Sequence, residues 1–127
     1  MLVPTRELAS QVQDQLMALC WGTKTGVLAV YGGAGMDKQI RSLSKGVEIV
    51  VATPGRLKDL LDRGSLRLDD VNLVVIDEAD RMADMGFLPQ VRAILDRTPA
   101  DGQRLLFSAT LDGEVATLVR RYLTDPV

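Results

Sequence analysis

Short apolar runs alternate along the chain with stretches in which apolar residues recur every three or four positions. The runs at residues 27–31, 47–52, 73–76 and 104–107 predict strands, and residues 1–4 predict the end of another. The helical spacing covers about residues 5–21, 37–44, 54–64, 78–86, 88–97 and 115–122. Because strands and helices alternate, the pattern predicts an α/β fold: a parallel sheet, built by right-handed crossovers, with helices on both faces.

Acidic residues follow directly after the apolar run at residues 73–76. This run is continuously apolar and rich in β-branched residues, which indicates a strand buried on both faces. Asp77, Glu78 and Asp80 follow it. In open α/β sheets ligands bind beyond the carboxyl ends of the strands. Neighbouring carboxylates repel one another unless a cation, a positive side chain or a proton intervenes.

Magnesium held by one or two carboxylates and by substrate phosphates is the cation that we expect at this acidic cluster. Asp77 would hold the metal, directly or through its waters, and Glu78 would orient or deprotonate an attacking water. The alternative is a plain helix N-terminus, where Asp and Glu favour the helix dipole.

Other unusual residues also fall directly after predicted strands. In a parallel sheet, all of these strand ends share one edge, so the residues are expected on one rim. In chain order the segments are Pro4-Thr5-Arg6-Glu7, Gly32-Gly33, Thr53-Pro54-Gly55-Arg56, the acidic cluster and Ser108-Ala109-Thr110.

Two arginines on this rim occupy positions that helices disfavour. Thr53 and Pro54 predict a helix start with a hydroxyl cap and proline in the first turn, and Gly55 allows a ligand to approach the backbone. Arg56 then opposes the helix dipole, and Arg6 repeats the pattern after Thr5. An anion at each N-terminus resolves both conflicts and suits successive phosphates of a nucleic-acid backbone. The alternative is that both arginines extend into solvent or pair with nearby acids.

The remaining rim segments are less specific. Gly32-Gly33-Ala34-Gly35 lacks a following Lys-Ser/Thr and does not fit G-x-G-x-x-G, so it predicts either a tight turn or a close approach of the backbone to a ligand strand. Ser108 and Thr110 have turn or capping roles by default. Because their strand is expected beside the acidic one, they are also candidates to hydrogen-bond Asp80.

Composition narrows the class of protein. The 127 residues suffice for one domain, and 46% are hydrophobic and 25% charged, as in ordinary globular proteins. The net charge of -2 requires any nucleic-acid contact to be local. There is no histidine, which excludes His-based triads and His metal ligands, and the single cysteine, Cys20, is interpreted as a core residue. One cysteine and no apolar run of membrane-spanning length favour a cytoplasmic location.

Five motifs, in this order and at this spacing, resemble the DEAD-box ATP-dependent RNA helicases of superfamily 2. They are P-T-R-E-L-A from Pro4, G-G at Gly32, T-P-G-R from Thr53, D-E-A-D from Asp77 and S-A-T from Ser108. The resemblance covers residues 1–127 and implies part of the first RecA-like, helicase ATP-binding domain, starting at P-T-R-E-L-A.

The resemblance implies roles for individual positions. Asp77 resembles the residue that binds magnesium with ATP, and Glu78 the one that activates the hydrolytic water. Asp80, Ser108 and Thr110 resemble the link between ATP state and RNA handling. The positions that resemble contacts to the RNA sugar-phosphate backbone, with little sequence preference, are Pro4, Thr5, Arg6, Glu7, Gly32, Gly33, Thr53, Pro54, Gly55 and Arg56.

The chain departs from the family pattern because no Gly-Lys pair occurs in it. The Walker A loop of the P-loop NTPase-type domain is therefore expected to be absent, together with the phosphate cradle. In the family this loop, its strand and its helix precede P-T-R-E-L-A, so the resemblance implies that the strand and helix are absent as well, as is the second RecA-like domain. We expect the 127 residues alone to hydrolyse no ATP, to unwind no RNA and to bind ATP and magnesium weakly at best. In the family the Walker A strand lies beside the S-A-T strand, so the edge between Arg104 and Phe107 is expected to be bare and to favour self-association.

Two other functions stay open on the sequence. One is a catalytically dead truncated module that binds RNA backbone weakly. The other is a flavodoxin-like or Rossmann-like domain that carries the motifs by chance. RNA affinity that falls with salt would favour the first, and flavin or dinucleotide binding the second.

Overall fold

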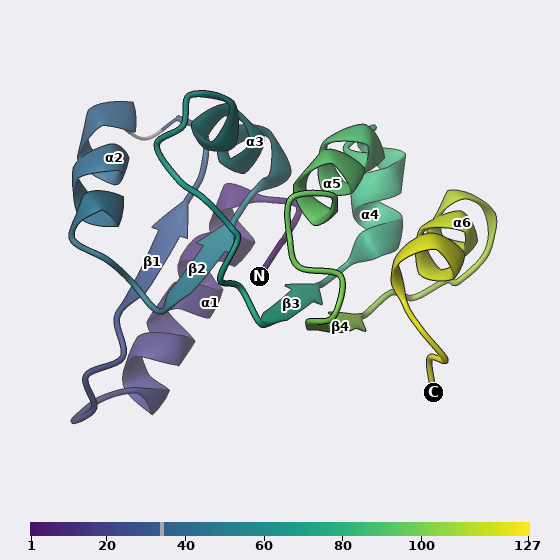
Figure 1. Cartoon of the computed structure of the whole chain (residues 1–127), viewed down its shortest axis with the longest axis horizontal. Coiled ribbons are helices and arrows are strands. Elements are labelled where there is room, and N and C mark those ends of the chain that lie inside the picture. Colours follow the sequence, from purple (N-terminus) through teal and green to yellow (C-terminus); the bar gives the residue numbers. More distant parts are fainter. Residues whose placement is uncertain (34) are drawn as a thin grey trace.

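The computed structural model describes residues 1–33 and 35–127, in which four strands and six helices alternate along the chain (Figure 1). The strands are β1 (Val27–Val30), β2 (Ile49–Ala52), β3 (Leu73–Ile76) and β4 (Gln103–Leu106). The helices are α1 (Arg6–Leu19), α2 (Met36–Ser44), α3 (Pro54–Asp62), α4 (Ala79–Asp84), α5 (Leu88–Leu95) and α6 (Gly113–Tyr122). Each predicted helix and the four predicted strands from residue 27 onward are present, with differences only at their ends, whereas residues 1–4 contribute isolated bridges at Leu2.

The strands form two parallel pairs that the first residues of the chain join. β1 pairs with β2 and β3 pairs with β4, all in parallel. Leu2 bridges Ala52 at the end of β2 and Ile76 at the end of β3. Its backbone N–H donates to the Val75 carbonyl at 2.8 Å. The predicted parallel sheet is therefore confirmed, and residues 1–3 occupy its centre.

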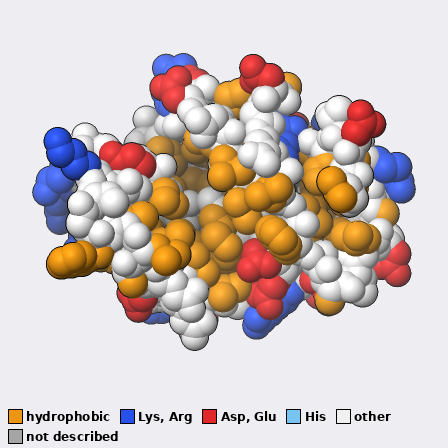
Figure 2. Space-filling model, turned by 90° about the horizontal axis from the view of Figure 1, so that it is seen from below, with side chains coloured by type: hydrophobic (Ala, Val, Ile, Leu, Met, Phe, Trp, Pro, Cys, Tyr) orange, Lys and Arg blue, Asp and Glu red, His pale blue; other side chains and the backbone are white. Residues whose placement is uncertain are grey.

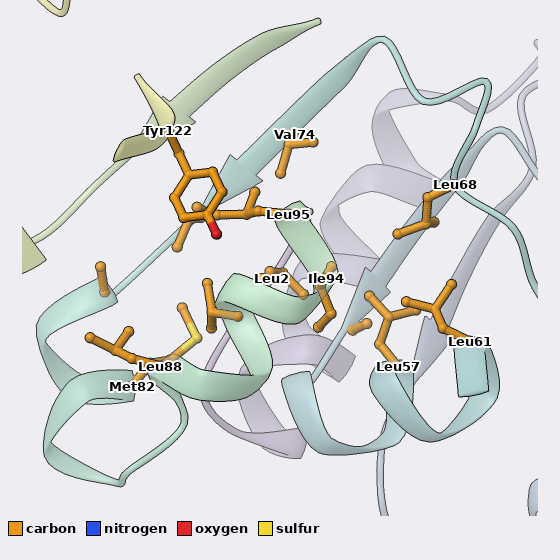
Figure 3. Close-up of a cluster of buried hydrophobic side chains, with 14 of the residues drawn as sticks. Leu2, Leu57, Leu61, Leu68, Val74, Met82, Leu88, Ile94, Leu95 and Tyr122 are labelled. Atoms are coloured by element: carbon orange, nitrogen blue, oxygen red, sulfur yellow. The ribbon is translucent and has the colours of Figure 1, made fainter. Parts of the chain in front are cut away.

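Helices cover the two faces unequally. On one face α1 packs on β1 and β2, where Ala9 meets Val3, Ala29 and Val51 in a small core. The opposite face carries the larger core, to which Leu2, Leu57, Val74 and other buried side chains of β3, α3, α4 and α5 contribute (Figure 3).

The α1 side of β3 and β4 is left open, because α1 reaches only the other strand pair. Leu73 is 46% exposed, Leu105 37% and Phe107 55%. Figure 2, a view from below Figure 1, shows apolar side chains gathered across the middle of the molecule. The prediction that residues 73–76 are buried on both faces is thus wrong for one face: Leu73 is exposed and Val75 half-buried, whereas Val74 and Ile76 are buried. We call Leu73, Leu105 and Phe107 the open face.

The end of α1 also differs from the prediction. The helix ends at Leu19, which is 80% exposed, and Trp21 is 87% exposed. Cys20 between them is half-buried, so its interpretation as a core residue is wrong. Among the described residues, no helix is long and apolar enough to cross a bilayer.

Candidate functional site

The acidic cluster begins at the carboxyl end of β3, as predicted. The backbone N–H of Asp77 donates to the Leu2 carbonyl at 3.0 Å, which anchors the end of the strand in the sheet. The Asp77 carboxylate turns back on the chain, and its Oδ1 accepts from the Glu78 N–H at 2.9 Å. Asp77 is half-buried. One carboxylate is therefore held in a fixed direction at the rim of the sheet.

Glu78 is held in an unfavourable conformation. Its φ of 53° and ψ of 50° are left-handed, which costs a residue with a Cβ about 1–2 kcal/mol. Its Oε2 is buried without a hydrogen-bond partner, and the Arg81 guanidinium lies 3.8 Å away. Backbone strain and a carboxylate oxygen that lacks a hydrogen-bond partner thus meet in one residue, whose side chain is 42% exposed and ion-paired with Arg81. Such features cluster at reacting sites.

The two residues that follow β4, Phe107 and Ser108, cap helix α4 from outside. Glu78 is the N-cap residue of α4 but makes no side-chain cap. The Phe107 carbonyl instead accepts from the Ala79 N–H at 3.1 Å, and Ser108 Oγ accepts from the Asp80 N–H at 3.1 Å. The expected contact between Ser108 and Asp80 is confirmed, although the backbone of Asp80 makes it. Thr110 lies two residues further along and is exposed.

The acidic residues after β3 fit a magnesium ion only if substrate phosphates supply some of its ligands. Within residues 1–33 and 35–127, no group of three or more acidic or cysteine side chains converges as a metal site. Magnesium does not require such a cage, since it is commonly bound by one or two carboxylates together with waters and substrate phosphates. The fixed Asp77 carboxylate and the unsatisfied Glu78 oxygen fit that arrangement.

Arg6 lies on the same rim, in the first turn of α1. Thr5 caps this helix through a 3.2 Å hydrogen bond from the Leu8 N–H to its Oγ1. The Arg6 guanidinium lies 5.4 Å from the centre of the Tyr31 ring, just after β1. Pro4 is buried, whereas Glu7 is exposed beside Arg6.

Gly32 and Gly33 form the exposed turn after β1. Gly33 has φ +83°, and a Cβ at this position would lie 2.7 Å from Arg6 Nη1. The backbone angle favours glycine here, and a Cβ would also force the guanidinium packed on it to move. The side chain that approaches this backbone closely is the chain's own Arg6, and the approach to a ligand strand stays a prediction. Ala34 of the same glycine-rich segment lies outside the described residues.

Helix α3 begins at Pro54, as the T-P-G-R segment predicts. Thr53 is the N-cap residue, but within the described structure its hydroxyl does not cap the helix, so that part of the prediction is wrong. Gly55 is exposed and has open space where a Cβ would stand. Arg56 is half-buried, and its Nη1 donates to Gln39 Oε1 at 2.9 Å.

Gln39, on α2, escaped the sequence reasoning. The sequence indicates its burial only weakly. Gln39 precedes the buried Leu43 by four positions, so this polar residue lies on the inward side of the predicted helix. The structure brings it between the turn after β1 and the start of α3.

Comparison with known proteins places these features in a family. A family model described as DEAD/DEAH box helicase matches residues 1–118. ATP-dependent RNA helicase DBP2 of Scheffersomyces stipitis is 51% identical over 126 residues, which are 99% of this chain and 24% of that protein. RNA helicase CrhR of Synechocystis is 48% identical over 125 residues, which are 98% of this chain and 25% of that protein.

Solved structures agree with the sequence comparison. A DEAD box protein from Methanococcus jannaschii has a TM-score of 0.93 at 43% identity, over 98% of this chain and 34% of that one. A hypothetical ATP-dependent RNA helicase from Sulfolobus tokodaii has a TM-score of 0.92 at 38% identity, over 99% of this chain and 38% of that one. The chain spans about a quarter of the length of the curated relatives, which were 24% and 25% covered.

Proposed function

Since the chain belongs to the DEAD/DEAH box helicase family, we propose that it is part of the first RecA-like domain of an ATP-dependent RNA helicase. In the intact protein it would couple ATP hydrolysis to RNA binding and unwinding. The observation that carries the proposal is that these residues share one rim of the sheet. The acidic residues follow β3. Arg6 follows the first residues of the chain, at the centre of the sheet, and Arg56 follows β2. The single cysteine suits the reducing cytoplasm, and that location is part of the proposal.

The acidic half of the rim would handle ATP. Asp77 would hold magnesium, whose charge neutralises the phosphates during transfer. The hydrogen bond from the Glu78 N–H holds one oxygen of the Asp77 carboxylate in place at the end of β3 and leaves the other for the metal. Glu78, whose Oε2 has no hydrogen-bond partner, would accept a hydrogen bond or a proton from the attacking water.

The end of β4 would link ATP state to RNA handling. Phe107 and Ser108 bind the first N–H groups of α4, which begins beside Glu78. A shift of the acidic residues would therefore move the end of β4 with them. Asp80, Ser108 and Thr110 are the residues proposed for this coupling.

The basic half of the rim would bind the RNA backbone. Arg6 and Arg56 each stand in the first turn of a helix, where the dipole and free N–H groups favour an anion. Contacts through phosphate and sugar imply little sequence preference. The other proposed contributors are Pro4, Thr5, Glu7, Gly32, Gly33, Thr53, Pro54 and Gly55.

For the 127 residues alone we propose no ATP hydrolysis and only weak RNA binding. The sequence contains no Gly-Lys pair, and so no lysine of the Walker A kind to reach the phosphates. Among the described strands, β4 pairs with β3 alone and so has a free edge. This edge and the exposed apolar side chains of the open face support self-association.

The test of the proposed function is a chimeric helicase. The 126 matching residues of the Scheffersomyces stipitis helicase are replaced by those of this chain, and RNA-stimulated ATP hydrolysis is measured. The chimera is expected to be active, and Glu78→Gln to lower its kcat by at least about a hundredfold, the usual size of general-base catalysis. Glu114→Gln, at an exposed position in the first turn of α6, is the matched control. A folded but inactive chimera, or an active Glu78→Gln variant, would contradict the proposal.

A further inference from the structure

Gln39 is the one polar side chain that is buried in the described part of the chain, with 6% of its surface exposed. It lies on α2, whose other buried residue is Leu43. A buried amide needs partners for both its donor and its acceptor, because water cannot supply them. Gln39 therefore places a polar side chain inside an apolar layer, and its two hydrogen-bond partners indicate its role.

Both partners belong to the rim. Gln39 Nε2 donates to the Tyr31 carbonyl at 3.1 Å, and Gln39 Oε1 accepts from Arg56 Nη1 at 2.9 Å. A carbonyl only accepts and a guanidinium only donates, so the amide fits in a single orientation. The amide thus ties the turn after β1 to the first turn of α3.

The same turn holds the other arginine. Arg6 packs over the Tyr31 ring and against Gly33. Gln39, through the Tyr31 carbonyl, fixes the segment on which Arg6 rests, and it also fixes Arg56 directly. The two arginines therefore share one support, although they come from helices far apart in the sequence.

We propose that Gln39 is a positioning residue, which holds the Arg56 guanidinium in place to bind a phosphate oxygen of single-stranded RNA. This inference rests on the proposed RNA-binding function. Arg56 has other contacts as well, so Gln39 sets its direction and is not its sole support. An arginine that is already ordered loses less conformational freedom when it binds a phosphate.

Two variants at Gln39 separate its roles. Gln39→Met keeps the length and most of the volume of the side chain but removes both hydrogen bonds. Gln39→Glu keeps an acceptor for Arg56 and loses the donor to Tyr31. Gln15→Met, on the exposed side of α1, is the matched control. Urea denaturation of every variant identifies the conditions in which each is folded.

The first readout needs no RNA. The guanidinium Nε–H signal of Arg56 in the 127-residue chain is followed by NMR, together with its rate of hydrogen exchange. Gln39→Met is expected to move the signal toward that of a free arginine and to speed exchange. Gln39→Glu is expected to keep it protected, and Gln15→Met to leave it unchanged. An Arg56 signal that Gln39→Met does not move would overturn the inference.

The second readout is a double-mutant cycle on affinity for a fluorescent oligouridine. Gln39→Met is expected to weaken binding about three- to tenfold in the wild-type background. Beside Arg56→Ala its effect should be smaller, because coupled residues are not additive and only the support of the Arg6 segment remains to be lost. Full additivity would overturn the inference, since a merely structural role acts through any background. A third outcome is that Gln39→Met moves the Arg56 signal but neither the wild type nor any variant binds RNA. In that case the proposed RNA-binding function is wrong, and so is the role of Gln39 in positioning Arg56 for a phosphate.

Discussion

At Gly33, one residue meets two separate demands. Its φ of +83° disfavours any Cβ, and Arg6 Nη1 occupies the space where that Cβ would stand, at 2.7 Å. We expect Gly33→Ala to lower the free energy of unfolding by about 1–2 kcal/mol through the backbone angle and to displace Arg6, which weakens RNA binding. Urea denaturation and oligouridine titration measure the two effects.

The matched control is Gly46→Ala. Gly46 also has φ +83°, but nothing lies within 4 Å of the Cβ position. It should lose similar stability and keep the RNA affinity of the wild type. Equal RNA affinities of the two alanine variants would show that Arg6 does not depend on Gly33.

Glu78 is the residue at which stability and activity are expected to conflict. It adopts φ 53° and buries an oxygen without a hydrogen-bond partner. Glycine tolerates this angle, so we expect Glu78→Gly to raise the free energy of unfolding by about 1 kcal/mol and to abolish ATP hydrolysis in the chimera. Chemical denaturation gives the first value. A less stable Glu78→Gly variant would mean that the strain is smaller than the stabilising contacts of the side chain.

Between elements, the cap that the two residues after β4 give to α4 is the main link in the acidic half of the rim. Ser108→Ala removes the acceptor for the Asp80 N–H. We expect a loss of about 1 kcal/mol, the usual value for a helix cap. Thr110→Ala, at an exposed position on the same segment, should change the stability little. Equal effects of the two substitutions in thermal or urea denaturation would refute the cap.

The contact between α6 and the end of α5 is expected to depend on pH. Burial and then the hydrogen bond to Asp96, at 2.7 Å, raise the pKa of Tyr122 above its ordinary value of 10.0. The folded state therefore disfavours the tyrosinate, and the stabilisation is complete below pH 10 and lost as the pH rises through the pKa of the folded state. In urea denaturation, Tyr122→Phe should be less stable than the wild type at pH 8, and the difference should shrink above pH 10. A difference that does not change with pH would contradict this assignment.

The order of the elements could be predicted from the sequence, because β-branched runs and helical spacing alternate cleanly. The apolar run 73–76 predicts a strand but does not tell which face a helix covers, so the exposure of Leu73 was missed. The rim residues could be predicted because every parallel strand ends at one edge. Gln39 could not, because its role depends on two partners that only the folded chain brings together.

For the molecule as a whole, the open face is the region where association is expected. Leu105 lies on the edge strand β4 and is 37% exposed, beside Phe107 at 55%. We expect the 127-residue chain to self-associate with rising concentration and Leu105→Lys to reduce this, since charge on an edge strand opposes pairing. Sedimentation velocity measures the effect. Leu19→Lys, at an 80% exposed position on α1, is the control, and a wild type that stays monomeric would contradict the expectation.

The central claim is that Arg6 and Arg56 make the rim a phosphate-binding surface in a chain of net charge -2. Its most direct test is the affinity of the 127-residue chain for oligouridine at several salt concentrations. We predict that the logarithm of the affinity falls linearly with the logarithm of salt, and that Arg6→Ala and Arg56→Ala each reduce the slope by about 0.7, one phosphate contact. Arg67→Ala, whose side chain is 82% exposed before β3, should leave the slope unchanged. Slopes that are equal in all four proteins would contradict the account.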